Sequence, residues 1–181
     1  MRLYPVGLVL EGRPCLVVGG GPVAARKAAG LAACGAVVTV VAPEPGAEVR
    51  SLEGVRVEAR PYRPGEAGDY RFVIAADAAS NALVHADAEA ANVFVNAADD
   101  PPRCSAVLPA VLRRGPLTVA CSTGGASPAL ASWVRDQVAE LIGPEVGEAA
   151  VTLAERRAEL HARGESTEGV DWRRQIEALL R

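Results

Sequence analysis

Aromatic residues, histidine and clustered basic charge are scarce in this sequence, and each shortage excludes a class of protein. Only 4% of the 181 residues are aromatic although 50% are hydrophobic, so Ala, Val and Leu must build the core. The formal net charge of −3 argues against a nucleic-acid or membrane-surface protein, since both need a concentrated basic face. With two histidines and no C-x-x-C pair among four cysteines, no metal-ligand cluster is visible. The composition is that of a soluble enzyme or ligand-binding domain.

The placement of cysteines and the length of hydrophobic runs indicate the compartment. Two of the four cysteines lie inside hydrophobic runs, where a thiol packs as a small apolar group, and we predict that all four are reduced. No apolar run reaches the ~18 residues of a membrane span, and no cleavable signal pattern opens the sequence. We therefore expect a cytoplasmic protein that binds neither nucleic acid nor membrane.

Five short hydrophobic runs are typical of buried parallel strands. They are rich in β-branched residues, and helical segments over 22–34 and 81–91 fall between them. Alternating strands and helices predict an α/β fold with a doubly wound, Rossmann-like parallel sheet, whose ligands bind beyond the carboxyl ends of the strands. The predicted strands cover 14–19, 36–42, 55–60, 70–76 and 93–98.

A different pattern begins after residue 104. Two short hydrophobic runs flank Gly115 and Pro116, which predicts two strands joined by a turn. Residues 127–143 predict a helix that Ser127 caps. An apolar stripe along this helix is weak support for dimerisation, because such a stripe more often belongs to an intramolecular core. The stripe consists of Leu130, Val134, Val138 and Leu141.

A glycine-rich turn joins the first predicted strand to the first predicted helix. Gly19, Gly21 and Ala24 form G-x-G-x-x-A, whose small residues let a backbone approach a pyrophosphate at the positive end of the helix. The alternative is a tight turn without a ligand. Lys27 follows on the same helix, where a solvated helix face is the favoured interpretation.

The end of the second predicted strand departs from the usual dinucleotide pattern. An acidic residue there normally binds the ribose 2′-hydroxyl of NAD, but this chain has Ala42. Glu44 lies two residues later and can serve instead, with backbone groups of Pro43 helping. No arginine directly follows the strand to bind a 2′-phosphate, so NAD is favoured over NADP.

Asp99 follows the fifth predicted strand and is the candidate catalytic residue. A carboxylate beside a dinucleotide can take the proton that accompanies removal of a hydride. The alternative is an ordinary turn aspartate before prolines, and Asp100 competes for either role.

A loop rich in hydroxyls and glycines, CSTGGASPA, precedes the helix that Ser127 caps. It can bind an anion or a substrate carboxylate, or it can serve only as a helix cap, and both interpretations stay open. The residues concerned are Ser122, Thr123, Gly124 and Gly125.

Two blocks of sequence together resemble the siroheme synthase N-terminal family. They are VVGGGPVAARKAAGLAACGAVVTVVAPE and VNAADDPPRCSAVLPAVLRRGPLTVACSTGGASPALASWVRDQV. The second block, with N-x-x-D, S-x-x-x-P and S-[ST]-G-G-x-S-P in order, is the more specific one. The resemblance covers residues 3–144. Members of this family are precorrin-2 dehydrogenases, several of which are also sirohydrochlorin ferrochelatases.

This resemblance implies a three-part chain and a set of site residues. The implied parts are an NAD-binding domain over 1–112, a dimerisation segment over 113–144 and a helical C-terminal domain over 145–181. The implied cofactor contacts are Gly19, Gly21, Pro22, Val23, Pro43 and Glu44. Asp99 is the implied catalytic residue, and the loop from Ser122 to Gly125 is implied to border the tetrapyrrole cleft. Relatives have A-T-[DN]-D where this chain has AADAASN, and no methyltransferase domain follows, so the chain resembles the stand-alone form.

The predicted activity is NAD-dependent dehydrogenation of precorrin-2 to sirohydrochlorin by a homodimer. Whether Fe²⁺ insertion into sirohydrochlorin accompanies it stays open. Arg103, Arg113 and Arg114 either bind substrate carboxylates or are solvated on the surface. Two other classes are an NAD-sensing regulatory module, against which Ala42 counts, and a non-catalytic dimeric scaffold.

Overall fold

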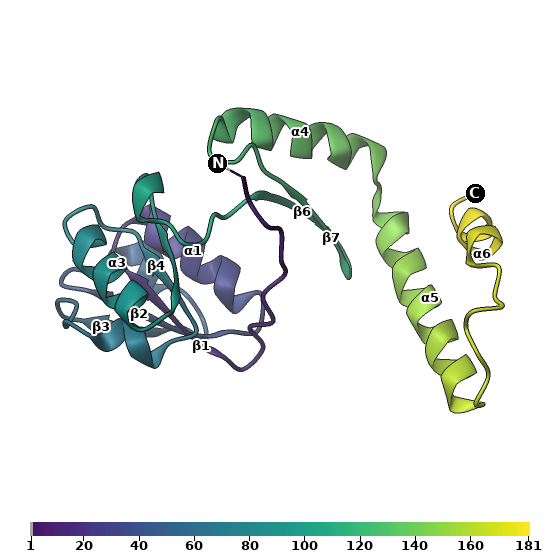
Figure 1. The fold of residues 1–181 in the computed structure, drawn as a ribbon, viewed down its shortest axis with the longest axis horizontal. Helices are drawn as coiled ribbons and strands as arrows, with labels where there is room; N and C mark the ends of the chain where they lie inside the picture. The colour runs from purple at the N-terminus through teal and green to yellow at the C-terminus, as the bar shows by residue number, and fades with distance from the viewer. Residues whose placement is uncertain (1) are drawn as a thin grey trace. The chain divides into compact units, whose positions relative to one another are not determined.

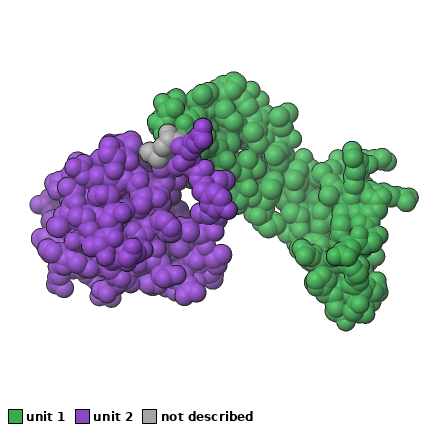
Figure 2. Space-filling view, viewed as in Figure 1, with its two compact units in different colours: residues 1, 109–181 green, residues 2–108 purple. Residues whose placement is uncertain are grey.

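The computed structural model describes residues 2–181, which divide into two compact units (Figure 2). The N-terminal unit comprises residues 2–108 and the C-terminal unit comprises residues 109–181. The three-part division at residues 112 and 144 stays a prediction.

The N-terminal unit is built on a sheet of five parallel strands in the order β3-β2-β1-β4-β5 (Figure 1). Each predicted strand is present within two residues of its expected bounds, and the predicted α/β doubly wound fold is confirmed. The strands are β1 (Pro14–Val18), β2 (Val37–Ala42), β3 (Arg56–Ala59), β4 (Phe72–Ala75) and β5 (Phe94–Ala97).

Alternating side chains along each strand enter the two faces of this sheet, as a period of two requires. On β1, Cys15 and Val17 pack in the cluster that contains α1 (Pro22–Ala32), whereas Leu16 and Val18 pack in the cluster that contains α3 (Asn81–Ala90). The helix residues that face the sheet are small, chiefly alanine and valine. A core with few aromatics is therefore closed by bringing helix and sheet backbones near each other. The short helix α2 (Ala47–Arg50) adds Val49 to the α1 side.

The C-terminal unit begins with an antiparallel hairpin and continues as helices. β6 (Ala110–Arg114) and β7 (Leu117–Cys121) pair across a turn at Gly115, whose φ is +53°. The predicted helix over 127–143 is confirmed as α4 (Pro128–Leu141), which packs on the hairpin. Two further helices follow, α5 (Pro144–Ala162) and α6 (Trp172–Leu179).

Arg114 connects the hairpin to the end of α4. Its Nε donates to the carbonyl of Ile142 at 3.0 Å and its Nη2 to the carbonyl of Ala139 at 3.4 Å. A cation at this place satisfies carbonyls that the helix leaves without partners and complements the negative end of the helix dipole. Arg114 is therefore a capping residue of α4, which neither sequence interpretation anticipated.

Candidate functional site

The carboxyl ends of the parallel strands carry most of the predicted site residues. Gly19 and Gly21 follow β1, Pro43 and Glu44 follow β2, and Asp99 follows β5. In an open parallel sheet of this order, ligands bind at this end, where the strand order reverses beside the first strand. These five residues therefore lie at one end of the N-terminal unit. Pro22 and Val23 open α1 at the same end.

The three glycines of the turn after β1 have different physical roles. Gly19 has a φ of +136°, and a Cβ there would lie 2.9 Å from the carbonyl oxygen of Ala76. A Cβ on Gly20 would collide with the carbonyl oxygen of Glu44. A Cβ on Gly21 would meet no atom within 4 Å. Gly19 and Gly20 thus let the turn pack on its own protein, while the space beside Gly21 is open to a ligand.

The N-terminus of α1 opens onto that space. Gly21 is its N-cap and makes no side-chain capping bond, Pro22 occupies the first turn, and no acidic side chain lies there. The first helical bond runs from the Ala25 amide to the Gly21 carbonyl, which leaves the amides of Val23 and Ala24 without partners in the helix. These donors and the positive helix end fit a pyrophosphate, and the open space at Gly21 gives it room.

The loop after β2 touches the glycine turn through its backbone. The Gly46 amide donates to the Gly20 carbonyl at 2.9 Å. Ala42 is buried, and a Cβ on Gly20 would lie 3.1 Å from the Ala42 side chain, so this position faces the turn. Glu44 is exposed and forms no hydrogen bond or ion pair within residues 2–181. Its carboxylate is the acidic group at the end of β2 that can meet a ribose.

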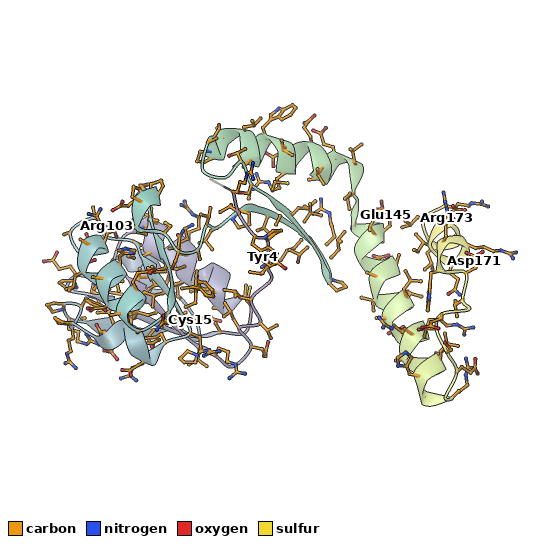
Figure 3. The ribbon with its side chains drawn as sticks, viewed as in Figure 1. Tyr4, Cys15, Arg103, Glu145, Asp171 and Arg173 are labelled. Carbon is orange, nitrogen blue, oxygen red and sulfur yellow. The ribbon has the colours of Figure 1, made fainter. Side chains whose placement is uncertain are left out.

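The loop after β5 distinguishes the two neighbouring aspartates. The carboxylate of Asp100 accepts from Arg103 Nη1 at 2.6 Å, so both of these side chains are engaged with each other. Arg103 is labelled in Figure 3. Asp99 is exposed, has a φ of +58°, and its carboxylate forms no hydrogen bond or ion pair within the described residues. A left-handed backbone at a non-glycine residue is strained and collects at functional sites. Of the pair, Asp99 is the carboxylate that can meet a substrate.

Lys27 also interacts electrostatically with this site, although a solvated helix face was the favoured interpretation of its sequence position. It lies on α1 half-buried rather than on a solvated helix face. Burial, and secondarily Arg26, lower the pKa of Lys27, while the charge of Asp99 acts in the opposite direction. The ammonium of Lys27 is therefore within electrostatic reach of the Asp99 carboxylate. The burial of Lys27 depends on tertiary packing, so the sequence pattern of the helix alone does not reveal it.

Cys104 closes the loop that carries Asp99. Its Sγ accepts from the Ala97 amide and donates to the Ala97 carbonyl, both at 3.2 Å. Burial raises the pKa of the Cys104 thiol, so the proton that it donates is retained. All four cysteines are free thiols. Cys104 therefore has a structural role, because its two hydrogen bonds to Ala97 hold the ends of this loop together.

The predicted substrate loop lies in the C-terminal unit, after β7. The Thr123 hydroxyl donates to the Ser127 carbonyl and accepts from the Ser127 amide, both at 2.9 Å, so its proton is engaged within its own turn. The Ser122 hydroxyl accepts from the Gly124 amide at 3.2 Å and keeps its proton available for a ligand. Ser127 accepts from the Leu130 amide at 3.2 Å, which confirms its predicted capping role.

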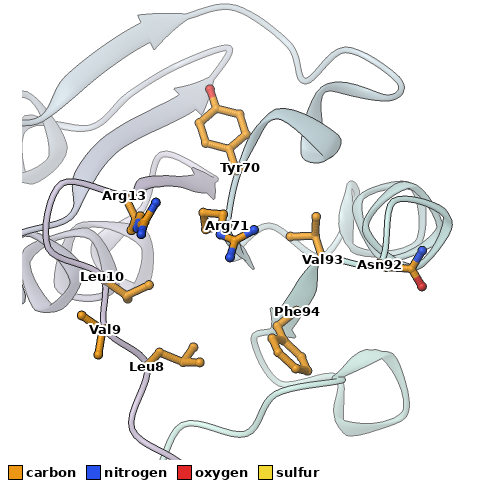
Figure 4. Close-up of a pocket in the computed structure, with 9 residues that line it drawn as sticks. All are labelled: Leu8, Val9, Leu10, Arg13, Tyr70, Arg71, Asn92, Val93 and Phe94. Atoms are coloured by element: carbon orange, nitrogen blue, oxygen red, sulfur yellow. The ribbon is translucent and has the colours of Figure 1, made fainter.

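A cavity of about 250 Å³ lies at the amino ends of the strands, opposite the predicted site (Figure 4). It borders the amino ends of the strands: Arg13 precedes β1, Arg71 precedes β4, and Phe94 opens β5. Its lining contains none of the predicted site residues. The candidate site is thus the carboxyl end of the sheet and not this cavity.

Comparisons with known proteins agree with both units. Residues 6–110 match the NAD(P)-binding family, and residues 114–141 match the family described as "Sirohaem biosynthesis protein central". The siroheme synthase of Methylobacillus flagellatus is 41% identical over 162 residues, which are 87% of this chain and 35% of that protein. The siroheme synthase of Ectopseudomonas mendocina is 40% identical over 153 residues, which are 83% of this chain and 33% of that protein. The chain therefore spans about a third of the length of these relatives.

A solved structure is similar over almost the whole chain. It is described as "SirC, precorrin-2 dehydrogenase", and it superposes with a TM-score of 0.72 at 30% identity, covering 98% of this chain and 88% of that one. The sheet order and the open glycine turn define a dinucleotide-binding α/β protein. The chain belongs to the sirohaem-biosynthesis family of NAD(P)-binding proteins that includes SirC, and the resemblance predicted from the sequence is confirmed.

Proposed function

We propose that this chain catalyses the NAD-dependent dehydrogenation of precorrin-2 to sirohydrochlorin. The observation that carries the proposal is the place of Asp99, whose unpaired carboxylate stands on a strained turn at the same sheet end as the open space beside Gly21. The similarity to SirC, a precorrin-2 dehydrogenase, supports the choice of substrate.

NAD⁺, when bound, accepts two electrons and one hydrogen nucleus from the substrate as a hydride. The second hydrogen leaves precorrin-2 as a proton, and we assign the Asp99 carboxylate as the base that receives it. Lys27 attracts this carboxylate from the side of α1. Because Asp100 is paired with Arg103, it does not compete for the proton.

The proposed cofactor contacts follow from the same geometry. Gly21, Pro22 and Val23 form the rim of the space at the start of α1, where pyrophosphate oxygens meet free amides. Gly19 allows the turn to pack closely against the Ala76 carbonyl. Glu44 accepts from a ribose hydroxyl, with the backbone at Pro43 beside it, and a carboxylate there disfavours the 2′-phosphate of NADP by charge repulsion.

We assign the Ser122 to Gly125 loop to the tetrapyrrole, whose carboxylates can accept from the Ser122 hydroxyl and the loop amides. Fe²⁺ is a second proposed substrate. A tetrapyrrole supplies four nitrogen ligands, so insertion needs a base for the pyrrole protons rather than a protein metal site, and Asp99 is the base available. In residues 2–181 no group of three His, Cys, Asp or Glu side chains is arranged to hold a metal.

A homodimer is proposed from the outer face of α4. Trp133 is 59% exposed and Leu141 is 84% exposed, and Leu130 and Val134 of the predicted stripe are exposed as well. Apolar side chains repeated along one helix face are unfavourable in water, and we propose that a second copy of the chain buries them.

Among the described residues no helix is long and apolar enough to cross a membrane. We propose a cytoplasmic location, where free thiols persist.

The decisive experiment is anaerobic turnover of precorrin-2, generated in situ, followed by absorbance. We expect sirohydrochlorin to form with NAD⁺, and Asp99→Asn to lower kcat by about 10²-fold or more while NAD⁺ binding is kept. Addition of Fe²⁺ to the product then tests insertion. No turnover from protein that binds NAD⁺ would favour a nucleotide sensor and contradict the enzyme.

A further inference from the structure

Asn81 makes an unusual buried connection between α3 and the loop that carries Asp99. It is the first residue of α3 and is only 3% exposed. Its Nδ2 donates to the carbonyl oxygen of Ala98 at 3.3 Å, seventeen residues further along the chain. Its Oδ1 is buried and has no partner within the described residues.

Such an arrangement costs stability. A buried amide oxygen without a partner loses its hydrogen bonds to water and gains none in return. The side chain does not cap its own helix, whose N-cap is Ser80, but reaches away from α3 to the neighbouring loop. An apolar residue of similar shape would remove this cost but would also leave the Ala98 carbonyl without its hydrogen bond, so the asparagine contributes little net stability.

The bond acts on the peptide unit that sets the conformation of Asp99. Rotating the peptide plane between Ala98 and Asp99 changes the ψ of Ala98 and the φ of Asp99 together. Within residues 2–181, the bond from Asn81 is the only hydrogen bond to either polar atom of that peptide. The preceding peptide is held separately, because the Ala98 amide donates to the Ala75 carbonyl at 2.7 Å.

Asp99 needs such a restraint because its φ of +58° is unfavourable for a residue with a side chain. Strained conformations persist only where surrounding contacts determine them. We propose that Asn81 is a positioning residue, which holds the Ala98–Asp99 peptide so that the Asp99 carboxylate stays directed toward the substrate. This inference rests on the proposed role of Asp99 as the base.

The test compares Asn81→Leu with His85→Leu, one turn later on the same helix. His85 also has a buried, unpartnered nitrogen, Nδ1, and forms no hydrogen bond to the Asp99 loop. We expect Asn81→Leu to lower kcat by about tenfold to a hundredfold, the size of a misplaced catalytic group. The KM for NAD⁺ and its dissociation constant should stay within about twofold. Tm should change little, because loss of the hydrogen bond to the Ala98 carbonyl and removal of the unpartnered Oδ1 act in opposite directions. His85→Leu should leave kcat unchanged.

A double-mutant cycle then shows whether Asn81 acts through Asp99. In an Asp99→Asn background, Asn81→Leu should cause little further loss of the residual turnover, because nothing is left to position. Equal losses in both backgrounds, or an unchanged kcat in Asn81→Leu, would overturn the inference. Should Asn81→Leu not fold, as judged by circular dichroism, Asn81→Ala provides the same comparison. Full activity in Asp99→Asn alone would instead contradict the proposed role of Asp99, which separates the two failures.

Discussion

Lys27 on α1 is a half-buried cation whose pKa is lowered mainly by burial and is raised in part by the charge of Asp99. Because it is the one lysine in the chain, its chemistry can be followed without interference from other lysines. Burial lowers its pKa, so a larger share of its amine is neutral at mildly alkaline pH than for an ordinary lysine. The pair joins two elements that are distant in sequence into one electrostatic unit.

Replacing Lys27 by Met should separate its catalytic contribution from its contribution to stability. We expect kcat/KM to fall by about tenfold, the equivalent of ~1.4 kcal/mol, because the attraction on the Asp99 carboxylate is lost. The free energy of unfolding should stay equal or rise, since a buried charge is replaced by an apolar side chain. Steady-state kinetics and urea unfolding of the same preparation measure both. A drop in stability large enough to explain the lost activity would refute the catalytic interpretation.

Lys27 also predicts a pH dependence of stability. Its folded-state pKa is lowered, so between that value and the ordinary value of 10.5 the unfolded chain binds more protons than the native state. Stability contributed by this group must therefore rise as the pH increases through that window. Comparing urea unfolding of wild type and Lys27→Met from about pH 8 to pH 10 isolates the slope. The wild type should gain stability relative to the variant across this range. Equal slopes for the two proteins would mean that Lys27 is solvated with an ordinary pKa, and the opposite trend would mean that its folded-state pKa is raised.

Alanine substitutions at two neighbouring glycines of the turn after β1 should have different effects, one on stability and the other on NAD⁺ binding. Gly20→Ala should destabilise the protein by about 1–3 kcal/mol, because the new methyl group collides with the Glu44 carbonyl. Gly21→Ala meets no protein atom and should leave stability equal or raise it by about 0.4–1 kcal/mol. Its effect should instead be on the dissociation constant of NAD⁺, measured by calorimetry, because the methyl group enters the proposed pyrophosphate space. Unaltered NAD⁺ affinity in Gly21→Ala would place the cofactor elsewhere.

Most of the fold could be predicted from the sequence because it depends on local patterns. The β-branched runs bounded by Gly and Pro located all five parallel strands, and the Ser127–Pro128 start located α4. The short helix α2 has too few residues for a periodic pattern, and it was not predicted. Pattern reading therefore succeeded for strands of four or more residues and for helices longer than a single turn.

The candidate site was less predictable because its details depend on contacts between distant segments. Lys27 is half-buried although its place on the helix favoured a solvated face, and the bond from Asn81 to the Ala98 carbonyl joins residues seventeen positions apart. The ion pair of Asp100 with Arg103, by contrast, joins residues only three positions apart and could have been anticipated from that spacing. Periodicity also revealed the apolar stripe of α4, but it does not show whether the residues that bury this stripe belong to the same chain or to a second copy.

Glu44 should determine the choice between NAD⁺ and NADP⁺. A charge-assisted hydrogen bond contributes about 1.5–3 kcal/mol, so Glu44→Gln should weaken NAD⁺ binding by roughly tenfold and narrow the preference over NADP⁺. Arg50 lies on α2 with its Nε on the Pro45 carbonyl at 2.9 Å, so a cation is already near this loop once the carboxylate is neutralised. Dissociation constants for both nucleotides measure the effect. Equal losses for the two nucleotides would show that Glu44 does not contact the ribose.

The exposed face of α4 gives the last prediction, which concerns assembly. Trp133→Glu places a charge in the middle of the apolar face. We expect the dissociation constant of the proposed dimer to increase by about tenfold or more, because burial of an unpaired carboxylate is costly. Arg157→Glu is the matched control, because Arg157 is exposed on α5 and forms no ion pair in residues 2–181. Sedimentation equilibrium over a range of concentrations measures both variants. Dimers of equal strength in all three proteins would mean that a different surface joins the copies, and a monomeric wild type would remove the dimer itself.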